Sequence, residues 1–182
     1  MSTRVAINGA CGRMGQLLVK LTHEDPDLTL TGALEAPGHP CLGRDVGEVV
    51  GAKRMEILVS ADEPPEADVM IDFSSPEGTL AKSKQAAAQG IAVLVGTTGL
   101  TPQQKGKIER LADQAAILIS PNMSIGVNLL LDLVQRCAEL TPEGFDIEIV
   151  ESHHRHKKDA PSGTAKRLLE AACDGRGWLP EE

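Results

Sequence analysis

The chain has 182 residues and a formal net charge of −8, which is enough sequence for one domain with its own core and a smaller second part. The acidic balance leaves no general basic surface, so nucleic acid is not expected as the main partner. An apolar run of membrane-spanning length and an apolar leader are both absent, so we expect a cytoplasmic protein without membrane attachment.

The four cysteines show no C-x-x-C pair. A disulfide framework is therefore not expected, nor is a cysteine-based zinc site, and a reducing compartment fits best. The chain holds two phenylalanines, one tryptophan and no tyrosine, so its core must be aliphatic.

The chain begins with the pattern of a strand, a glycine-rich turn and a helix. Residues 3–8 are a short run with β-branched members, glycines follow at Gly9, Gly12 and Gly15, and an apolar periodic segment starts at Gln16. This order is that of a dinucleotide fingerprint, although the spacing is G-x-x-G-x-x-G. We expect Gly9 and Gly12 to let the backbone turn tightly against a pyrophosphate at the helix N-terminus. An ordinary glycine-rich turn is the alternative.

A second strand is expected over residues 28–34, and Glu35 follows it. Glu35 lies about 20 residues beyond the last fingerprint glycine, where a carboxylate binds the adenosine ribose hydroxyls. A carboxylate repels the 2′-phosphate of NADP(H), and the next residue, Ala36, cannot attract it. NADH is therefore favoured as the cofactor, and NADPH is the second choice because Arg13 or Arg44 could partly compensate. The alternative is that Glu35 merely ends a strand in solvent.

Strands and helices continue to alternate as far as residue 120. Residues 36–54 are expected to form a loop with one helical turn. The apolar strand 91–95 ends in Gly96, Thr97 and Thr98, where an open α/β sheet places ligand contacts. The alternation predicts an α/β fold with a parallel sheet that is covered by helices on both faces. The other expected elements are strands at 56–60, 68–73 and 116–119 and helices at 76–89 and 101–114.

The pattern changes near residue 124. Residues 125–140 predict a long helix with an apolar stripe, and residues 145–149 alternate apolar and acidic side chains, as in a strand with one wet face. A further helix is expected over residues 161–173. One half-wet strand cannot bury its dry face alone, so we expect strands of another chain, or sequence missing from a truncated chain, to complete this second substructure.

Three histidines and three lysines or arginines occupy positions 153–158. Histidine exchanges protons near neutral pH, so His153 or His154 can supply the proton that accompanies a hydride. Lys157 can stabilise negative charge or donate a proton. The unpaired N–H groups of Gly163 and Thr164 at a helix start favour a carboxylate. These features indicate reduction of a small, anionic, unsaturated substrate.

Two other interpretations of this cluster stay open. Three histidines in four residues could bind a metal, but strand alternation would place them on different faces, and no metal is predicted. The run could also be a solvated basic loop without a function.

These motifs resemble the dihydrodipicolinate reductase family over essentially all of residues 4–173. The resemblance implies NAD(P)H-dependent reduction of a small dicarboxylate heterocycle, 4-hydroxy-tetrahydrodipicolinate, in lysine and diaminopimelate biosynthesis. It also implies a Rossmann domain at 1–123, a partial α+β substrate domain with a mixed open sheet at 124–182, and a homo-oligomer, a tetramer in the family. The matching segments are residues 5–15, 71–73, 95–99, 121–128 and 151–164.

The resemblance also assigns roles to individual residues. It implies that His153 and Lys157 are proton donors and that His154, Gly163 and Thr164 bind the carboxylates of the substrate. Family members continue for several more strands, so the alternative is a relative that binds NADH without turnover. The residues implied to line the cofactor are Gly9, Ala10, Cys11, Gly12, Arg13, Met14, Glu35, Gly96, Thr97, Thr98, Ser120, Pro121, Asn122 and Met123.

Overall fold

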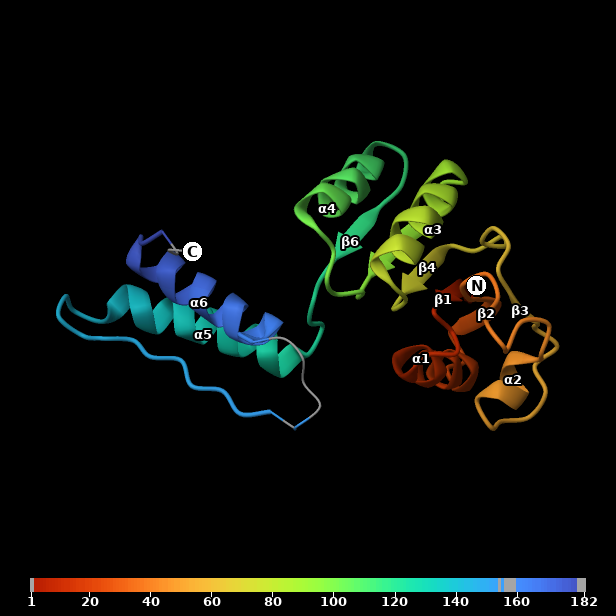
Figure 1. Cartoon of the computed structure of the whole chain (residues 1–182), viewed down its shortest axis with the longest axis horizontal. Helices are drawn as coiled ribbons and strands as arrows, with labels where there is room; N and C mark the ends of the chain where they lie inside the picture. The colour runs from red at the N-terminus through yellow and green to blue at the C-terminus, as the bar shows by residue number, and fades with distance from the viewer. Residues whose placement is uncertain (1, 154, 156–159, 180–182) are drawn as a thin grey trace. The chain divides into compact units, whose positions relative to one another are not determined.

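The structure is a computed structural model that describes residues 2–153, 155 and 160–179 (Figure 1). The chain divides into two compact units, Met1–Pro121 and Asn122–Glu182. Among the described residues, no helix combines the length and the apolar character needed to cross a membrane.

The first unit is built on a six-stranded sheet with the order β3-β2-β1-β4-β5-β6. Every neighbouring pair of these strands is parallel, as predicted from the alternation of strands and helices. β3 is shorter than predicted because Glu56 takes a positive φ of 61°, which is incompatible with a strand. The strands are β1 (Thr3–Asn8), β2 (Leu28–Leu34), β3 (Val59–Ser60), β4 (Val69–Asp72), β5 (Ala92–Val95) and β6 (Ile117–Ile119).

Several helices of this unit begin at side-chain caps. The Ser75 hydroxyl accepts a hydrogen bond from the Gly78 N–H, and Thr101 and Gln104 form a reciprocal capping box. The helix expected over 101–114 turns into a 3₁₀ helix at Arg110. The elements are α1 (Arg13–Glu24), α2 (Val46–Val49), α3 (Pro76–Ala88), α4 (Pro102–Glu109) and η1 (Arg110–Asp113).

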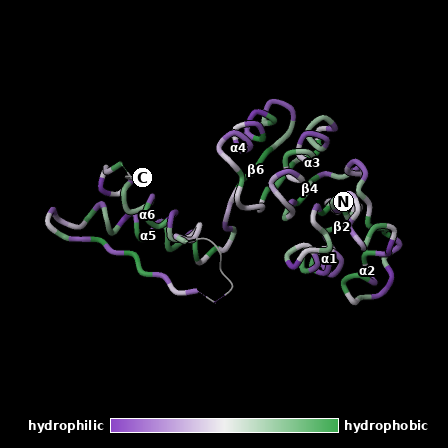
Figure 2. Tube along the Cα trace, viewed as in Figure 1, coloured by the Kyte–Doolittle hydropathy of each residue, from purple (hydrophilic) through white to green (hydrophobic). Residues whose placement is uncertain are grey.

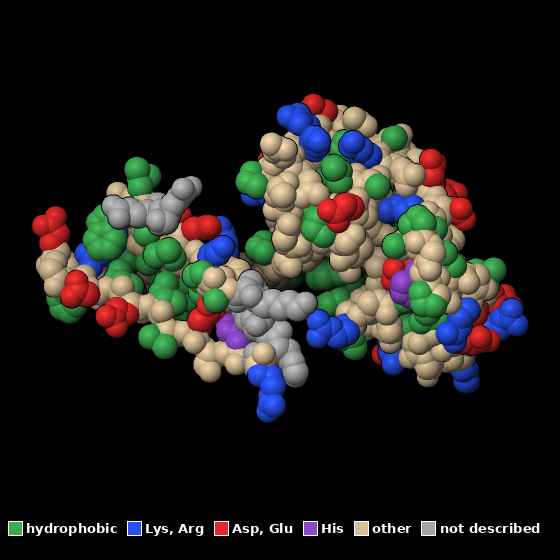
Figure 3. All heavy atoms as spheres, in the orientation of Figure 1, with side chains coloured by type: hydrophobic (Ala, Val, Ile, Leu, Met, Phe, Trp, Pro, Cys, Tyr) green, Lys and Arg blue, Asp and Glu red, His purple; other side chains and the backbone are tan. Residues whose placement is uncertain are grey.

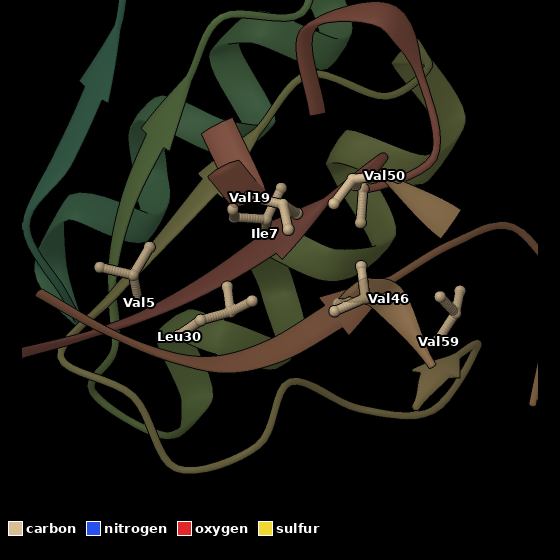
Figure 4. Packing of buried hydrophobic residues seen from close by; sticks show 9 residues of the cluster. Val5, Ile7, Val19, Leu30, Val46, Val50 and Val59 are labelled. Carbon is tan, nitrogen blue, oxygen red and sulfur yellow. The ribbon is translucent and has the colours of Figure 1, made fainter. Parts of the chain in front are cut away.

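Successive residues of β1 point into two cores on opposite faces of the sheet. Val5 and Ile7 pack with Val19 of α1 and with Leu30 of β2, as Figure 4 shows. Ala6 belongs to the other cluster, which also holds Met70, Val93 and Ile108. Because the sheet is buried on both faces, its strands need the continuous apolar runs seen in the sequence.

The second unit consists of two helices that pack against each other, α5 (Ile125–Leu140) and α6 (Gly163–Arg176). Ser124 and Ser162 cap them by accepting bonds from the N–H groups of Val127 and Ala165. A Cβ at Gly175 would lie 2.3 Å from the Gln135 carbonyl oxygen, so this glycine allows the helices to approach closely. The predicted helix 125–140 is confirmed at both ends, and the helix predicted over 161–173 runs to Arg176.

The strand predicted over residues 145–149 is not formed. A ladder needs a partner, and the described part of the second unit contains no other strand for this segment to pair with. Instead, the Arg176 guanidinium donates to the Phe145 carbonyl oxygen at 3.2 Å. All five residues of the segment are exposed, including Phe145, so the predicted dry face is not formed in this chain either.

Candidate nucleotide-binding site

A cavity of about 710 Å³ opens at the carboxyl ends of β1, β2 and β4. Its walls include Gly9 and Gly12 from the turn after β1, Glu35 from the end of β2, and residues 73–75 between β4 and α3. Ligands of doubly wound sheets bind at this edge, and the volume suits a small molecule or one part of a dinucleotide.

The turn after β1 has no room for side chains at its glycines. Gly9 has a φ of +81°, and a Cβ there would lie 2.5 Å from the Phe73 carbonyl oxygen. A Cβ at Gly15 would lie 2.0 Å from the Gly9 carbonyl oxygen. Gly12 is the N-cap of α1 and offers no side chain to its first-turn N–H groups, which can therefore face an anion.

Glu35 connects the end of β2 to this turn. One oxygen of its carboxylate, Oε1, accepts from the Cys11 N–H at 2.9 Å, and Oε2 accepts from the Ala36 N–H at 3.1 Å. The side chain is partly buried in the cavity wall, so Glu35 does more than end a strand in solvent. Beside it, burial and the neighbouring Cys41 thiol raise the pKa of Cys11 to about 12, which keeps that thiol neutral at physiological pH.

Asp72 holds together the strand ends behind the cavity. Its side chain is fully buried at the end of β4 and accepts hydrogen bonds from the Asn8 amide at 2.5 Å, the Thr97 hydroxyl at 2.6 Å and the Thr79 hydroxyl at 2.7 Å. The same Thr97 oxygen accepts from the Ser74 N–H at 2.8 Å. The side chain of Thr97 is thus engaged within the protein, and it fixes the loop after β5.

Several residues of this region were not predicted as site residues, among them Asp72, Lys82 and His39. Asp72 is an acid at the end of an apolar strand, which is a signal the sequence does contain. Lys82 lines the cavity, its ammonium group donates to the Ala61 carbonyl oxygen at 2.8 Å, and burial lowers its pKa. Lys82 lies with Thr79 and Ala86 on the buried face of α3. A lysine at the helical spacing of buried residues is a signal that the sequence does contain. His39 also lines the cavity, from a loop with no periodic pattern.

The residues predicted to line the cofactor fall into three groups. Gly9, Cys11, Gly12 and Glu35 line the cavity. A second group does not line the cavity and lies in the turn before α1, in the first turn of α1, after β5 or after β6. Its members are Ala10, Arg13, Met14, Gly96, Thr97, Thr98, Ser120 and Pro121.

Asn122 and Met123 form the third group, because they belong to the second unit. The Asn122 side-chain oxygen accepts from the Ser124 N–H at 2.9 Å, and its carbonyl oxygen accepts from the Asn128 amide at 3.0 Å. Asn122 therefore shapes the turn that starts α5.

The predicted catalytic stretch lies at the start of α6 in the second unit. The Glu151 carboxylate accepts from the Ser162 N–H at 2.8 Å and lies 3.4 Å from His153 Nδ1. Gly163 and Thr164 are the first two residues of α6, as predicted. Glu151 thus links the histidine to the helix start, a contact that sequence reasoning did not assign. His154 and Lys157 lie outside the described residues.

The strand order, the glycine turn and the carboxylate after β2 together define a dinucleotide-binding protein of the doubly wound class. Two family models match the sequence, dihydrodipicolinate reductase N-terminus over residues 3–123 and dihydrodipicolinate reductase C-terminus over residues 126–178. The chain belongs to the dihydrodipicolinate reductase family, which confirms the resemblance read from its motifs.

Similar proteins include curated enzymes and a solved structure. The 4-hydroxy-tetrahydrodipicolinate reductase of Rubrobacter xylanophilus is 46% identical over 98% of this chain and 67% of its own length. That of Anaeromyxobacter dehalogenans is 42% identical over 99% of this chain and 68% of its own length. A dipicolinate-bound dihydrodipicolinate reductase from Paenisporosarcina sp. TG-14 aligns with a TM-score of 0.73 at 26% identity, over 100% of this chain and 69% of that one. The chain therefore spans about two thirds of the length of these relatives.

Proposed function

We propose that the chain reduces 4-hydroxy-tetrahydrodipicolinate to tetrahydrodipicolinate with a nicotinamide cofactor, a step of lysine and diaminopimelate biosynthesis. The observation that carries this proposal is the match of both family models, which together span residues 3–178 with a short gap. The first unit supplies a cavity suited to the cofactor, and the second supplies a histidine beside a helix start. In this proposal residues 1–123 bind the cofactor and residues 124–182 bind the substrate.

The residues around the cavity fit a dinucleotide. Gly9 lets the backbone turn tightly after β1, and Gly12, the N-cap of α1, carries no side chain that would compete with a pyrophosphate for the first N–H groups of the helix. The Cys11 N–H holds Glu35 in the cavity wall, where its remaining lone pairs can accept from ribose hydroxyls. When bound, the cofactor supplies a hydride.

NADH is the favoured cofactor in this proposal, because the Glu35 carboxylate opposes the negative 2′-phosphate of NADPH and Ala36 offers no positive charge. A Glu35→Gln variant should tighten NADPH relative to NADH by about tenfold, the effect of removing about 1.4 kcal/mol of repulsion. Fluorescence titration with each cofactor measures this ratio, and Glu48→Gln on the exposed side of α2 is the control. An unchanged ratio in Glu35→Gln would refute the role of Glu35.

In the second unit, His153 and Lys157 are proposed as proton donors. The Glu151 carboxylate beside Nδ1 orients the His153 ring, so that the other ring nitrogen is left to face the substrate. His154 and the N–H groups of Gly163 and Thr164 are proposed to hold the substrate carboxylates, because a helix N-terminus stabilises an anion.

A coupled assay tests the reaction. Pyruvate, aspartate semialdehyde and dihydrodipicolinate synthase generate the substrate, and the absorbance of NADH is followed after the protein is added. Oxidation of NADH that depends on all three components is the expected result. A folded sample that binds NADH but does not oxidise it would instead support the second candidate, a nucleotide-binding relative without turnover. The segment at 145–149, which lacks a strand partner in the described structure, favours that candidate.

We further propose that the protein is cytoplasmic and assembles as a homo-oligomer through the second unit. The support for assembly is the apolar surface of α5 and of the segment that follows it, where Leu129, Leu133 and Phe145 are exposed. Light scattering of the purified chain at several concentrations would test this, and a monomer at all concentrations would refute it.

A further inference from the structure

Three side chains with metal-binding atoms converge beside the glycine turn. The sulfur atoms of Cys11 and Cys41 and a ring nitrogen of His39 all lie within 4.8 Å of one another, and each residue is half-buried. Cys11 belongs to the turn after β1, whereas His39 and Cys41 belong to the loop between β2 and α2. The cluster therefore joins two segments about 30 residues apart, so it could not be recognised from a C-x-x-C spacing in the sequence.

Hydrogen bonds hold both segments in place. The Cys11 N–H donates to Glu35 at 2.9 Å, and the Gln16 amide donates to the Cys11 carbonyl oxygen at 2.8 Å. In the other loop, the Cys41 N–H donates to His39 Nδ1 at 3.2 Å, which keeps the imidazole beside Cys41. The same loop is closed by the Leu42 N–H bond to the His39 carbonyl oxygen at 3.1 Å. The three side chains are thus gathered by ordered backbone on both sides.

We propose that Cys11, His39 and Cys41 form a binding site for a divalent ion of the zinc class. Two sulfur atoms and one imidazole nitrogen suit zinc, and they do not suit magnesium or calcium, which take oxygen ligands. Tetrahedral zinc with bonds of about 2.3 Å to sulfur and about 2.1 Å to nitrogen holds such atoms roughly 3.5–4 Å apart. The three ligand atoms lie within 4.8 Å of one another, so they must move closer together by up to about 1 Å when a zinc ion binds.

Three protein ligands leave the fourth position of a tetrahedral ion for water or a small ligand. Cys11 and His39 both line the 710 Å³ cavity, so this position lies at the cavity wall. The site adjoins the proposed cofactor cavity, but none of its three side chains is assigned a chemical step in the proposed reduction.

Cobalt spectroscopy tests the site on the whole chain. The fully reduced protein, freed of metal by a chelator, is titrated with Co²⁺ in a thiol-free reductant. The expected result is one equivalent of cobalt with a thiolate-to-cobalt band in the near ultraviolet and the strong visible bands of tetrahedral cobalt, both removed by Zn²⁺. An octahedral spectrum, or no thiolate band, would overturn the proposal.

Variants locate the ligands. Cys11→Ser, Cys41→Ser and His39→Ala should each weaken cobalt binding at least tenfold, in line with the loss of one metal ligand. Cys137→Ser in α5 is the matched control and should leave the spectrum unchanged. An unchanged cobalt affinity with a thiolate band of full intensity in Cys11→Ser or in Cys41→Ser, or a weakened band in the control, would contradict the assignment.

A measurement on the unaltered chain covers the case in which a variant does not fold. Zn²⁺ should protect Cys11 and Cys41 from alkylation while the exposed Cys137 reacts at its metal-free rate, as read by peptide mapping. Equal alkylation of Cys11 and Cys41 with and without Zn²⁺ would refute the site. A mass two hydrogens lower, with Cys11 joined to Cys41, would show a disulfide in place of a metal site.

Discussion

The two units differ in what they do with their apolar residues. In the first, Val5, Ile7 and Met70 are at most 1% exposed, because a sheet covered by helices offers two protected faces. In the second, Ile125 is 87% exposed and Val150 is 92% exposed. Figure 2 shows hydrophobic residues along the traces of both units, and Figure 3 shows that many reach the surface of the second.

The difference teaches that an apolar pattern predicts an element but not its burial. The hydrophobic residues that are buried in the described part of the second unit are small. They are Ala138, Ala165, Ala171, Ala172 and Cys173. Two helices protect only the stripe where they touch, so the larger apolar side chains of α5 need a further surface. The first unit should thus carry most of the stability, and the second most of the chemistry.

The largest expected effect is a loss of catalysis without a loss of cofactor binding. His153→Gln removes the proposed proton donor and should lower kcat by about 10²–10⁴-fold, the usual contribution of a general acid. Its affinity for NADH should stay within about twofold, because the cofactor contacts are proposed to lie within residues 1–123 and do not include His153. Steady-state kinetics and NADH fluorescence titration measure the two quantities on the same sample. A parallel loss of NADH affinity would contradict the proposal that cofactor binding and proton donation belong to different parts of the chain.

The first unit was largely predictable from the sequence. Glycine, proline or helix-capping residues lie near the ends of its strands, and continuous apolar runs are typical of a parallel sheet covered on both faces. Gly9, Gly12 and Glu35 could be predicted as cavity residues because the spacing of a dinucleotide fingerprint has a known physical reason. Asp72 and Thr97 were not linked in advance, since their hydrogen bond joins strand ends whose register cannot be read from a single sequence. The strand predicted at 145–149 is not formed. The alternation of its side chains is a local pattern, whereas a strand also needs a partner from another part of the sheet.

A large apolar residue in each unit tests where the stability lies. Ile7→Ala removes a fully buried side chain between β2 and α1 and should cost about 2–5 kcal/mol of unfolding free energy. Leu133→Ala in α5, where the side chain is 51% exposed, should cost less than about 1 kcal/mol. Urea unfolding followed by circular dichroism measures both.

Fluorescence of Trp178, the single tryptophan of the chain, reports on the second unit alone. Its transition should be unaffected by Ile7→Ala. Equal costs for the two substitutions would mean that the second unit is as well packed as the first.

A smaller effect is expected from glycines that differ in their surroundings. Gly15→Ala would place a Cβ 2.0 Å from the Gly9 carbonyl oxygen, so α1 must move away from β1 at a cost of about 1–3 kcal/mol. Gly126→Ala in α5 meets no atom closer than the Ser124 hydroxyl at 3.9 Å, and it should stabilise its helix by roughly 0.5–1 kcal/mol. Thermal unfolding should therefore shift in opposite directions for the two variants. A loss of stability in both would show that α5 is held more tightly than its exposed face indicates.

The smallest effect is a pH dependence confined to the first unit. Asp45 caps α2, and its carboxylate accepts from the N–H groups of Gly47 and Met55, which lower its pKa below the ordinary value of 3.8. A depressed folded-state pKa contributes stability above the unfolded pKa, and that contribution is lost as the pH falls below about 4 and through the folded pKa. Asp45→Asn should therefore lower the urea midpoint of the circular dichroism transition at neutral pH and have a shrinking effect at acid pH. The Trp178 transition should not respond to the substitution at either pH. A difference between wild type and Asp45→Asn that is constant with pH would mean that the cap acts through shape rather than charge.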